Sequence, residues 1–300
     1  MVLIRNELDV HRKFMKPLKT KPFISIAIPT SISLDSKTLR EQTIKISYIG
    51  RAAAIFRVEN IMVYNDGEGD EKLVEAILKY MEVPPYLKKF LVPLLPELRF
   101  VGIIPPLKTP HHVELEIFDI TYREGVVLDR SEDRCIVEIG LGKKGVVYGR
   151  CPPKGSRVTV KIVRETSSYF HVFIVEKSEV DIYWGYSVQL YESLKKLLEN
   201  AKDSHYLVLV ATKKGIPVHS VEEELAREFM KREKILIVFG GPKLDVDEVA
   251  QREGFDINSY TNFSVNFIPR QGTVNVRTEE AVIAVLAIIN YIKEKHLGLP

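Results

Sequence analysis

The sequence predicts an α/β protein whose parallel sheet is interrupted by a small inserted antiparallel β-barrel. Residues 1–110 alternate β-branched runs with helical patterns, and residues 181–300 return to that alternation. Between them, residues 111–180 contain only short strand patterns. Each α/β piece has too few strands for a covered parallel sheet. We therefore expect one discontinuous α/β domain, 1–110 with 181–300, around a barrel domain, 111–180; three separate domains are the alternative.

Two strands and two helices are predicted in the first piece. The strands are FISIAI and NIMVY, at 23–28 and 60–64, and the helices cover about 36–58 and 70–83. Several prolines prevent a single helix over 90–110, which we interpret as a linker packed on this domain.

The middle stretch predicts five or six short strands separated by Gly or charged turns. They fall at 113–122, 124–130, 134–141, 144–150, 156–165 and 169–177. Such spacing is typical of a small antiparallel barrel.

The last piece predicts three further strands, each followed or preceded by a helix. Helix 185–202 leads to strand 206–212, helix 219–234 opens with a Ser220/Glu223 capping box, and strand 235–241 precedes a helix capped by Asp245 and Glu248. After a third strand, at 265–268, Thr278 is the expected N-cap of a final helix. Every residue of 281–289 is apolar, so this helix needs two partners: its own sheet and, we expect, a second subunit.

Composition sets broad limits on function. The net charge of +3 and pI near 8.6 permit nucleic acid as a partner without requiring it. Cys135 and Cys151 have no zinc-site spacing, and reduced thiols are the simplest expectation. The charged start is no signal peptide and no apolar run could span a membrane, so a cytoplasmic protein is expected.

The ends of the three C-terminal strands carry residues suited to ligand binding. Ligands of open α/β sheets bind beyond the carboxyl ends of the strands. Thr212 ends the first of these strands, Gly240-Gly241-Pro242 the second and 269–273 the third. A tight turn is the ordinary alternative for the glycines. Because neither a dinucleotide fingerprint nor a P-loop is present, both of those site types are disfavoured.

Four segments resemble the SPOUT superfamily, in particular its archaeal and eukaryotic branch of RNA methyltransferases with an inserted OB-like domain. They are ILIVFGGP (235–242), NFIPRQGTVNVRTEEAVIAVLAIIN (266–290), IGRAAAIFRVENIMVYND (49–66) and YWGYSV (183–188). The resemblance implies a trefoil-knotted domain, S-adenosylmethionine as cofactor and a homodimer formed through the C-terminal helix. The implied cofactor-binding residues are Thr212, Gly240, Gly241, Ile268, Pro269, Gln271, Gly272, Thr273 and Thr278.

The resemblance also suggests catalytic and RNA-binding residues. Arg51 and Arg277 are the candidate catalytic residues, with Arg57 as an alternative bearer of the role of Arg51. Candidate RNA contacts are Lys143, Lys144, Arg150, Lys154, Arg157, Tyr169 and Arg270, with Tyr148 as a further aromatic. An ion pair or a solvated surface charge is the ordinary alternative for these cations.

The predicted function is therefore S-adenosylmethionine-dependent methylation of RNA, with ribosomal RNA expected on family grounds. Neither cysteine is suited to a covalent adduct, so a base nitrogen or a ribose oxygen is the expected acceptor. The alternative is a non-catalytic RNA-binding or ribosome-assembly protein that retains the fold. An enzyme acting on a small molecule or a protein is a third possibility.

Overall fold

The computed structural model describes residues 16–112 and 121–297, which form two compact units. One unit comprises 16–19, 83–93, 108–112 and 121–184; the other comprises 20–82, 94–107 and 185–297. The first unit thus includes 16–19 and 83–93, which the predicted boundaries assigned to the α/β part. Most of the strand expected at 113–122 lies outside the described residues.

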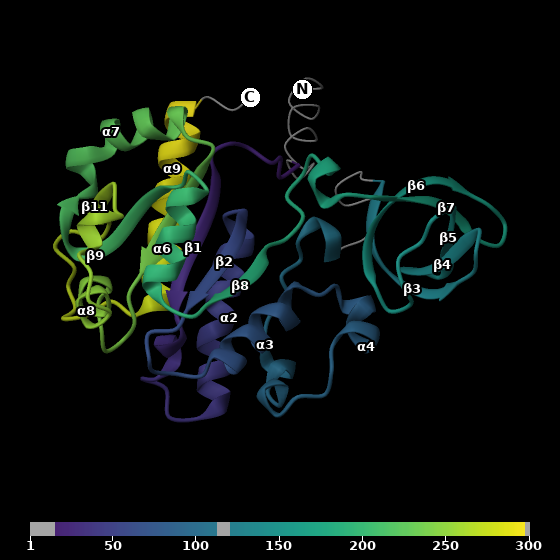
Figure 1. The fold of residues 1–300 in the computed structure, drawn as a ribbon, viewed down its shortest axis with the longest axis horizontal. Helices are drawn as coiled ribbons and strands as arrows, with labels where there is room; N and C mark the ends of the chain where they lie inside the picture. The colour runs from purple at the N-terminus through teal and green to yellow at the C-terminus, as the bar shows by residue number, and fades with distance from the viewer. Residues whose placement is uncertain (1–15, 113–120, 298–300) are drawn as a thin grey trace, which may run out of the picture. The chain divides into compact units, whose positions relative to one another are not determined.

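The larger unit contains a six-stranded sheet in which every neighbouring pair is parallel, as predicted. The strand order is β11-β9-β10-β1-β2-β8. Their bounds are β1 (Phe23–Pro29), β2 (Val58–Tyr64), β8 (Ser187–Tyr191), β9 (Leu207–Pro217), β10 (Lys234–Phe239) and β11 (Phe263–Asn266). The first and the last parts of the chain thus meet where β1 pairs with β10 (Figure 1).

Helices cover both faces of this sheet. One apolar core joins it to α2 (Leu39–Ile55), α3 (Glu71–Glu82), α7 (Val218–Lys231) and α9 (Thr278–Leu297). A second core joins its other face to α6 (Leu194–Asp203) and α8 (Val246–Arg252). Figure 1 shows α9, in yellow, running beside the purple β1. No helix among the described residues is long and apolar enough to cross a membrane.

Several helix ends differ from prediction because backbone pairing and tertiary contacts set them. The expected helix 185–202 is wrong in its first half, since 187–191 pairs with β2 as strand β8 and only 194–203 is helical. Helix α7 begins at Val218, so the Ser220/Glu223 box does not form. The Asp245/Glu248 box of α8 is confirmed, and α2 has a further box made by Thr38 and Glu41.

The chain between the end of α3 and residue 112 contains only short helical turns. The prolines of 90–110 break this stretch into α4 (Lys88–Leu91) and the 3-10 turns Pro96–Leu98, Val101–Ile103 and Pro110–His112. The expectation that no long helix forms there is confirmed.

The smaller unit contains a closed five-stranded barrel with the order β3-β4-β5-β7-β6. Its strands are β3 (Tyr122–Arg130), β4 (Arg134–Leu141), β5 (Lys143–Tyr148), β6 (Arg157–Glu165) and β7 (Phe170–Val175). The expectation of a wholly antiparallel barrel is wrong at one pair, because β7 runs parallel to β5. The antiparallel β6–β7 pair brings β7 back in the direction of β5, and this pairing closes the barrel.

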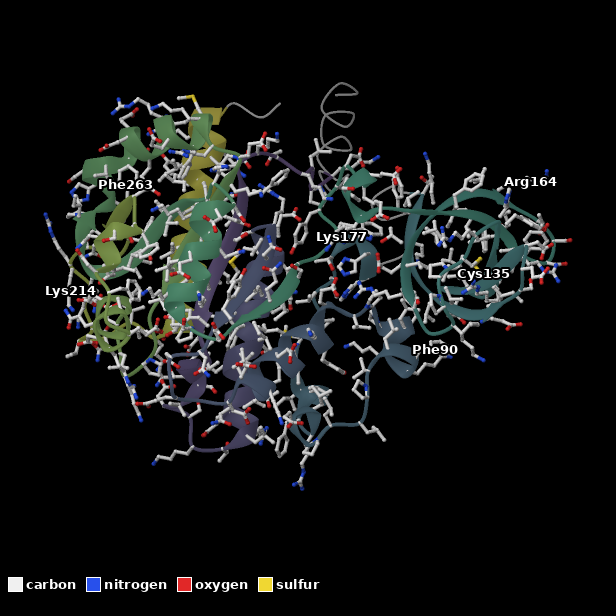
Figure 2. The ribbon with its side chains drawn as sticks, in the orientation of Figure 1. Phe90, Cys135, Arg164, Lys177, Lys214 and Phe263 are labelled. Carbon is white, nitrogen blue, oxygen red and sulfur yellow. A yellow bond between two sulfur atoms is a disulfide. The ribbon has the colours of Figure 1, made fainter. Side chains whose placement is uncertain are left out.

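Cys135 and Cys151 form a disulfide, so the expectation of two free thiols is wrong. Cys135 lies on β4 opposite Val147 of β5, and the chain after β5 brings Cys151 back, with 6.0 Å between the two Cα atoms. Both cysteines belong to the apolar barrel core, and Figure 2 marks Cys135 within the barrel. The sequence separation of 16 residues gave no sign of this proximity.

Candidate functional site

A pocket of about 640 Å³ opens beside the second half of β9 and the carboxyl ends of β10 and β11. Its walls come from residues 211–214 of β9, the segment after β10, the segment after β11 and the first turns of α9. This is the position at which open α/β sheets bind ligands, and the volume is that of a small-molecule site. All three predicted strand ends therefore contribute to one cavity.

The pocket combines an apolar floor with polar edges. Phe239, Phe267 and Val285 line it and are almost fully buried. Thr212 and Gln271 add a hydroxyl and an amide to the lining. Such a mixture suits a ligand with an apolar body and a few groups that need hydrogen bonds.

Hydrogen bonds join the segments that form the pocket. Thr278 Oγ1 donates to the Gly240 carbonyl at 3.0 Å, which ties α9 to the end of β10. Thr212 Oγ1 donates to Asp245 Oδ2 at 2.8 Å, which ties β9 to α8. Asn266 Nδ2 donates to the Lys213 carbonyl at 3.1 Å, which ties β11 to β9. The walls of the cavity are thus held together before any ligand binds.

A buried cluster of polar side chains, formed by Thr30, Ser31 and Asp66, lies next to Gly241. Thr30 Oγ1 donates to Asp66 Oδ1 at 2.9 Å, and Ser31 Oγ donates to Asp66 Oδ2. All three side chains are at most 5% exposed. A Cβ atom added to Gly241 would lie against Ser31 Oγ, well inside van der Waals contact. At Gly241 the absence of a side chain therefore makes room for Ser31 of the protein itself.

Tyr64 fixes the end of β10 from another side. Its hydroxyl donates to the Phe239 carbonyl at 2.7 Å. Burial, followed by the nearby carboxylates of Asp66 and Asp245, raises the pKa of Tyr64 well above its usual value. The hydroxyl therefore keeps its proton and donates at any physiological pH.

Six of the nine predicted cofactor-binding residues line the pocket: Thr212, Gly240, Gly241, Ile268, Gln271 and Thr278. Pro269, Gly272 and Thr273 belong to the same segment after β11 but are not lining residues. Thr278 is the first residue of α9, so its expected role as N-cap is wrong by one position. Arg277 precedes the helix instead, and Glu280 Oε2 accepts a hydrogen bond from its backbone N–H at 2.9 Å.

The two predicted catalytic arginines lie in different places. Arg277 lines the pocket and is exposed. Arg51 is not a lining residue; its Nη1 donates to the carbonyl oxygens of Pro106 and Leu107 at 2.7 and 2.9 Å. Arg57, the alternative, binds Asn290 and Glu294 of α9. We therefore assign a pocket position to Arg277 alone.

Asp35 is a lining residue that the sequence analysis missed. Its carboxylate pairs with Lys45, which is 5% exposed and also lies 3.3 Å from Glu279 Oε2 at the start of α9. One sequence signal existed: Lys45 stands between Ile44 and Ile46 in a largely apolar helix, where a buried lysine needs a carboxylate partner. Its partners come from segments about ten and more than two hundred residues away.

The predicted RNA contacts of the barrel differ in their surroundings. Three of the cations are paired: Lys143 with Glu165, Lys144 with Glu138, and Arg157 with the buried Glu124. Glu124 also accepts hydrogen bonds from Thr159 and from Trp184, which is packed inside this unit.

The remaining predicted contacts have no such ion pair among the described residues. Arg150 and Lys154 are exposed in the segment after β5, and the Tyr169 hydroxyl lies 3.4 Å from that of Tyr148. Arg270, in the segment after β11, is exposed and has a φ of 59°.

Comparison with known proteins shows which family the chain belongs to. The model of a family described as "Putative RNA methyltransferase" matches residues 23–289. The 28S rRNA (uridine-N(3))-methyltransferase of Drosophila melanogaster is 30% identical, over 89% of this chain and 61% of that protein. The proteins of the same name from Mus musculus and Homo sapiens are 30% and 29% identical, covering 75% and 77% of those proteins.

Solved structures are more distant. The A. aeolicus TrmH/SpoU tRNA modifying enzyme aligns with a TM-score of 0.39 at 10% identity, over 98% of this chain and 85% of that one.

The chain spans less than two thirds of the Drosophila protein. Because the family model matches most of the sequence, the chain belongs to this family of RNA methyltransferases, in agreement with the predicted enzyme class.

Proposed function

We propose that this protein transfers the methyl group of S-adenosylmethionine to N3 of a uridine in ribosomal RNA. The observation that carries the proposal is the convergence of residues 211–214 of β9 with the ends of β10 and β11 on one pocket in a member of this family. The names of the fly, mouse and human relatives support the acceptor and the RNA. N3 of uridine is one of the base nitrogens that the sequence analysis left open.

The lining residues fit the cofactor chemically. Phe239, Phe267 and Val285 offer apolar surface, while the backbone of Gly240 and Gly241 and the hydroxyl of Thr212 offer hydrogen-bonding groups. The sulfonium supplies a methyl group that is already activated for in-line displacement. The chain itself then has to align the acceptor and exclude water. Pro269, Gly272 and Thr273 belong to the proposed site through the resemblance alone.

Methylation at N3 also requires a proton acceptor, and we propose Asp35. During methyl transfer, the N3 proton of the uridine would pass to a carboxylate of the chain. Among the described lining acids, Asp245 and Glu248 are used to cap α8. Asp35 Oδ1 binds Lys45, whereas no described group donates a hydrogen bond to Oδ2. That oxygen is available to the substrate.

Three finer features of the fold belong to the proposal. The trefoil knot and the OB-like identity of the barrel follow from the resemblance; the barrel order β3-β4-β5-β7-β6, with its parallel β5–β7 pair, supports the latter. A homodimer through α9 is supported by its exposed apolar side chains, Ile283 and Tyr291.

Transfer of labelled methyl tests the function. The purified chain is incubated with labelled S-adenosylmethionine and ribosomal RNA from cells that lack the gene, and the RNA nucleosides are analysed by mass spectrometry. We expect label in 3-methyluridine. Bound RNA without label would favour the non-catalytic alternative, and label in a different nucleoside would refute the acceptor.

Asp35→Asn tests the proton acceptor. General-base catalysis contributes roughly 10²–10⁴-fold, so kcat should fall by at least about a hundredfold. The Kd for S-adenosylmethionine should stay within about twofold, and Asp35→Glu should restore part of kcat. Asp203→Asn, an exposed acid at the end of α6, is the matched control. Unchanged kcat in Asp35→Asn would exclude the role.

A further inference from the structure

Three aromatic rings follow one another on the outside of the barrel. The ring centroids of Tyr148 and His171 are 5.5 Å apart, and those of His171 and Phe173 are 5.3 Å apart. Tyr148 is 50% exposed and Phe173 is 49% exposed. We call these three residues the aromatic row.

The strand register explains why these rings face outward. Val147 on β5 and Val172 on β7 belong to the barrel core. Side chains alternate along a strand, so Tyr148, His171 and Phe173 point away from that core. The two strands pair directly, which brings the rings of different strands together. The row is therefore built into the barrel and does not depend on a loop.

Cations flank the row on both neighbouring strands. Arg134 on β4 pairs with Tyr148, while on β6 Lys161 pairs with Phe173 and Arg164 pairs with His171. Figure 2 marks Arg164 on the barrel. All three cations are exposed, and within the described residues no carboxylate forms an ion pair with them. They differ in this respect from Lys143, Lys144 and Arg157.

We propose that the aromatic row binds a single-stranded segment of the RNA substrate. Its bases stack on the rings and its phosphates lie next to Arg134, Lys161 and Arg164. The identity of the ligand as RNA comes from the proposed function, on which this inference rests. The choice of single strands follows from the rings, because the base faces of a duplex are already stacked and unavailable. A surface that recognised only backbone charge would not need exposed rings.

The test uses the full chain and fluorescence anisotropy with two probes. One is a fluorescein-labelled oligouridine of about ten nucleotides, and the other is an RNA duplex of the same length. Loss of one or two base–ring stacks weakens binding by about tenfold or more. Tyr148→Ala/Phe173→Ala should therefore raise the Kd for the single strand by at least about tenfold and leave that for the duplex within about twofold.

Two variants serve as controls. Tyr148→Phe/Phe173→Tyr keeps both ring faces and should bind the single strand as the wild type does. Phe90→Ala removes an exposed ring elsewhere in the same unit and should have no effect. If the double alanine variant melts at a lower temperature, Phe173→Leu replaces it, because leucine keeps apolar bulk without a ring. The Kd for the single strand should then rise while that for the duplex stays unchanged.

Two outcomes would overturn the inference: wild-type affinity of the alanine variant for oligouridine, or an equal loss for both probes. RNA binding does not require methyl transfer, so the result of the anisotropy experiment is independent of the result of the methylation assay. A wild-type chain that transfers no methyl group, yet binds single strands through the row, would refute the proposed function alone.

Discussion

At the scale of single residues, the two glycines after β10 are more constrained than the one after β11. A Cβ at Gly241 would collide with Ser31 Oγ, whose position is fixed by its hydrogen bond to the buried Asp66. A Cβ at Gly272 would have no protein atom within 4 Å. The three glycines looked alike in the sequence because each follows a strand.

We expect Gly241→Ala to weaken binding of S-adenosylmethionine by about tenfold or more, because the segment after β10 must move to admit the methyl group. Isothermal titration calorimetry measures this. Gly102→Ala, where the added methyl group meets no atom within 4 Å, is the control and should bind as the wild type does. Gly272→Ala adds information: since its methyl group meets no protein atom, any loss of affinity there reports contact with the ligand itself.

The resemblance predicted part of the pocket lining, but it predicted neither Asp35 nor the buried Ser31–Asp66 pair. Gly240 and Gln271 lie in segments that resemble family motifs, Thr212 lies at the predicted end of a strand, and each lines the pocket. Asp35 and the Ser31–Asp66 pair come from the ends of β1 and β2 instead. They reach the pocket region because β1 pairs with β10, a contact between residues more than two hundred positions apart. No local sequence pattern reports such a pairing.

At the scale of elements, β9 and β11 approach each other unusually closely. Strand β9 continues to Pro217 rather than ending at Thr212, because Ile216 and Pro217 pair with Val265 and Asn266 of β11. A Cβ at Gly215 would lie 2.6 Å from backbone atoms of Ser264 and Val265. Backbone atoms cannot yield as a flexible side chain does.

Gly215→Ala should therefore lower the free energy of unfolding by about 1–3 kcal/mol, the usual cost of overpacking. Urea denaturation followed by circular dichroism measures the change. Gly102→Ala serves again as the matched control and should unfold with the wild-type midpoint. Equal midpoints for all three proteins would show that β11 can move away from β9 without cost.

The element that sequence patterns predicted least well is β8. Residues 187–191 read as the start of a helix because a strong helical pattern follows them, with Leu194, Leu197 and Leu198 on one face. Pairing with the exposed edge of β2 makes them a strand instead. In the barrel, local alternation predicted all five described strands, whereas the parallel β5–β7 pair depends on how the sheet closes. Local sequence patterns thus predicted most of the elements, but they did not predict which strands pair with one another.

At the scale of the whole molecule, the apolar character of α9 has two sources. Val282, Val285, Leu286 and Ile289 are buried against the sheet. Ile283 and Tyr291 are 45% and 57% exposed. Arg57, two residues beyond the end of α2, binds Asn290 and Glu294 of α9, and α2 itself adds two more exposed apolar side chains, Tyr48 and Ile55. We predict that these four side chains form one apolar face, as an isologous dimer requires.

We expect the wild-type chain to be a dimer at micromolar concentration and Ile283→Lys to be a monomer. Each copy of the substituted chain would bring a charge into an apolar contact that repeats across the two-fold axis, while the exposed site leaves the fold of the subunit intact. Size-exclusion chromatography with light scattering measures the mass. Leu94→Lys, at a fully exposed leucine on neither helix, should stay dimeric. A monomeric wild type, or a dimeric Ile283→Lys, would show that the face formed by α2 and α9 is not the subunit interface.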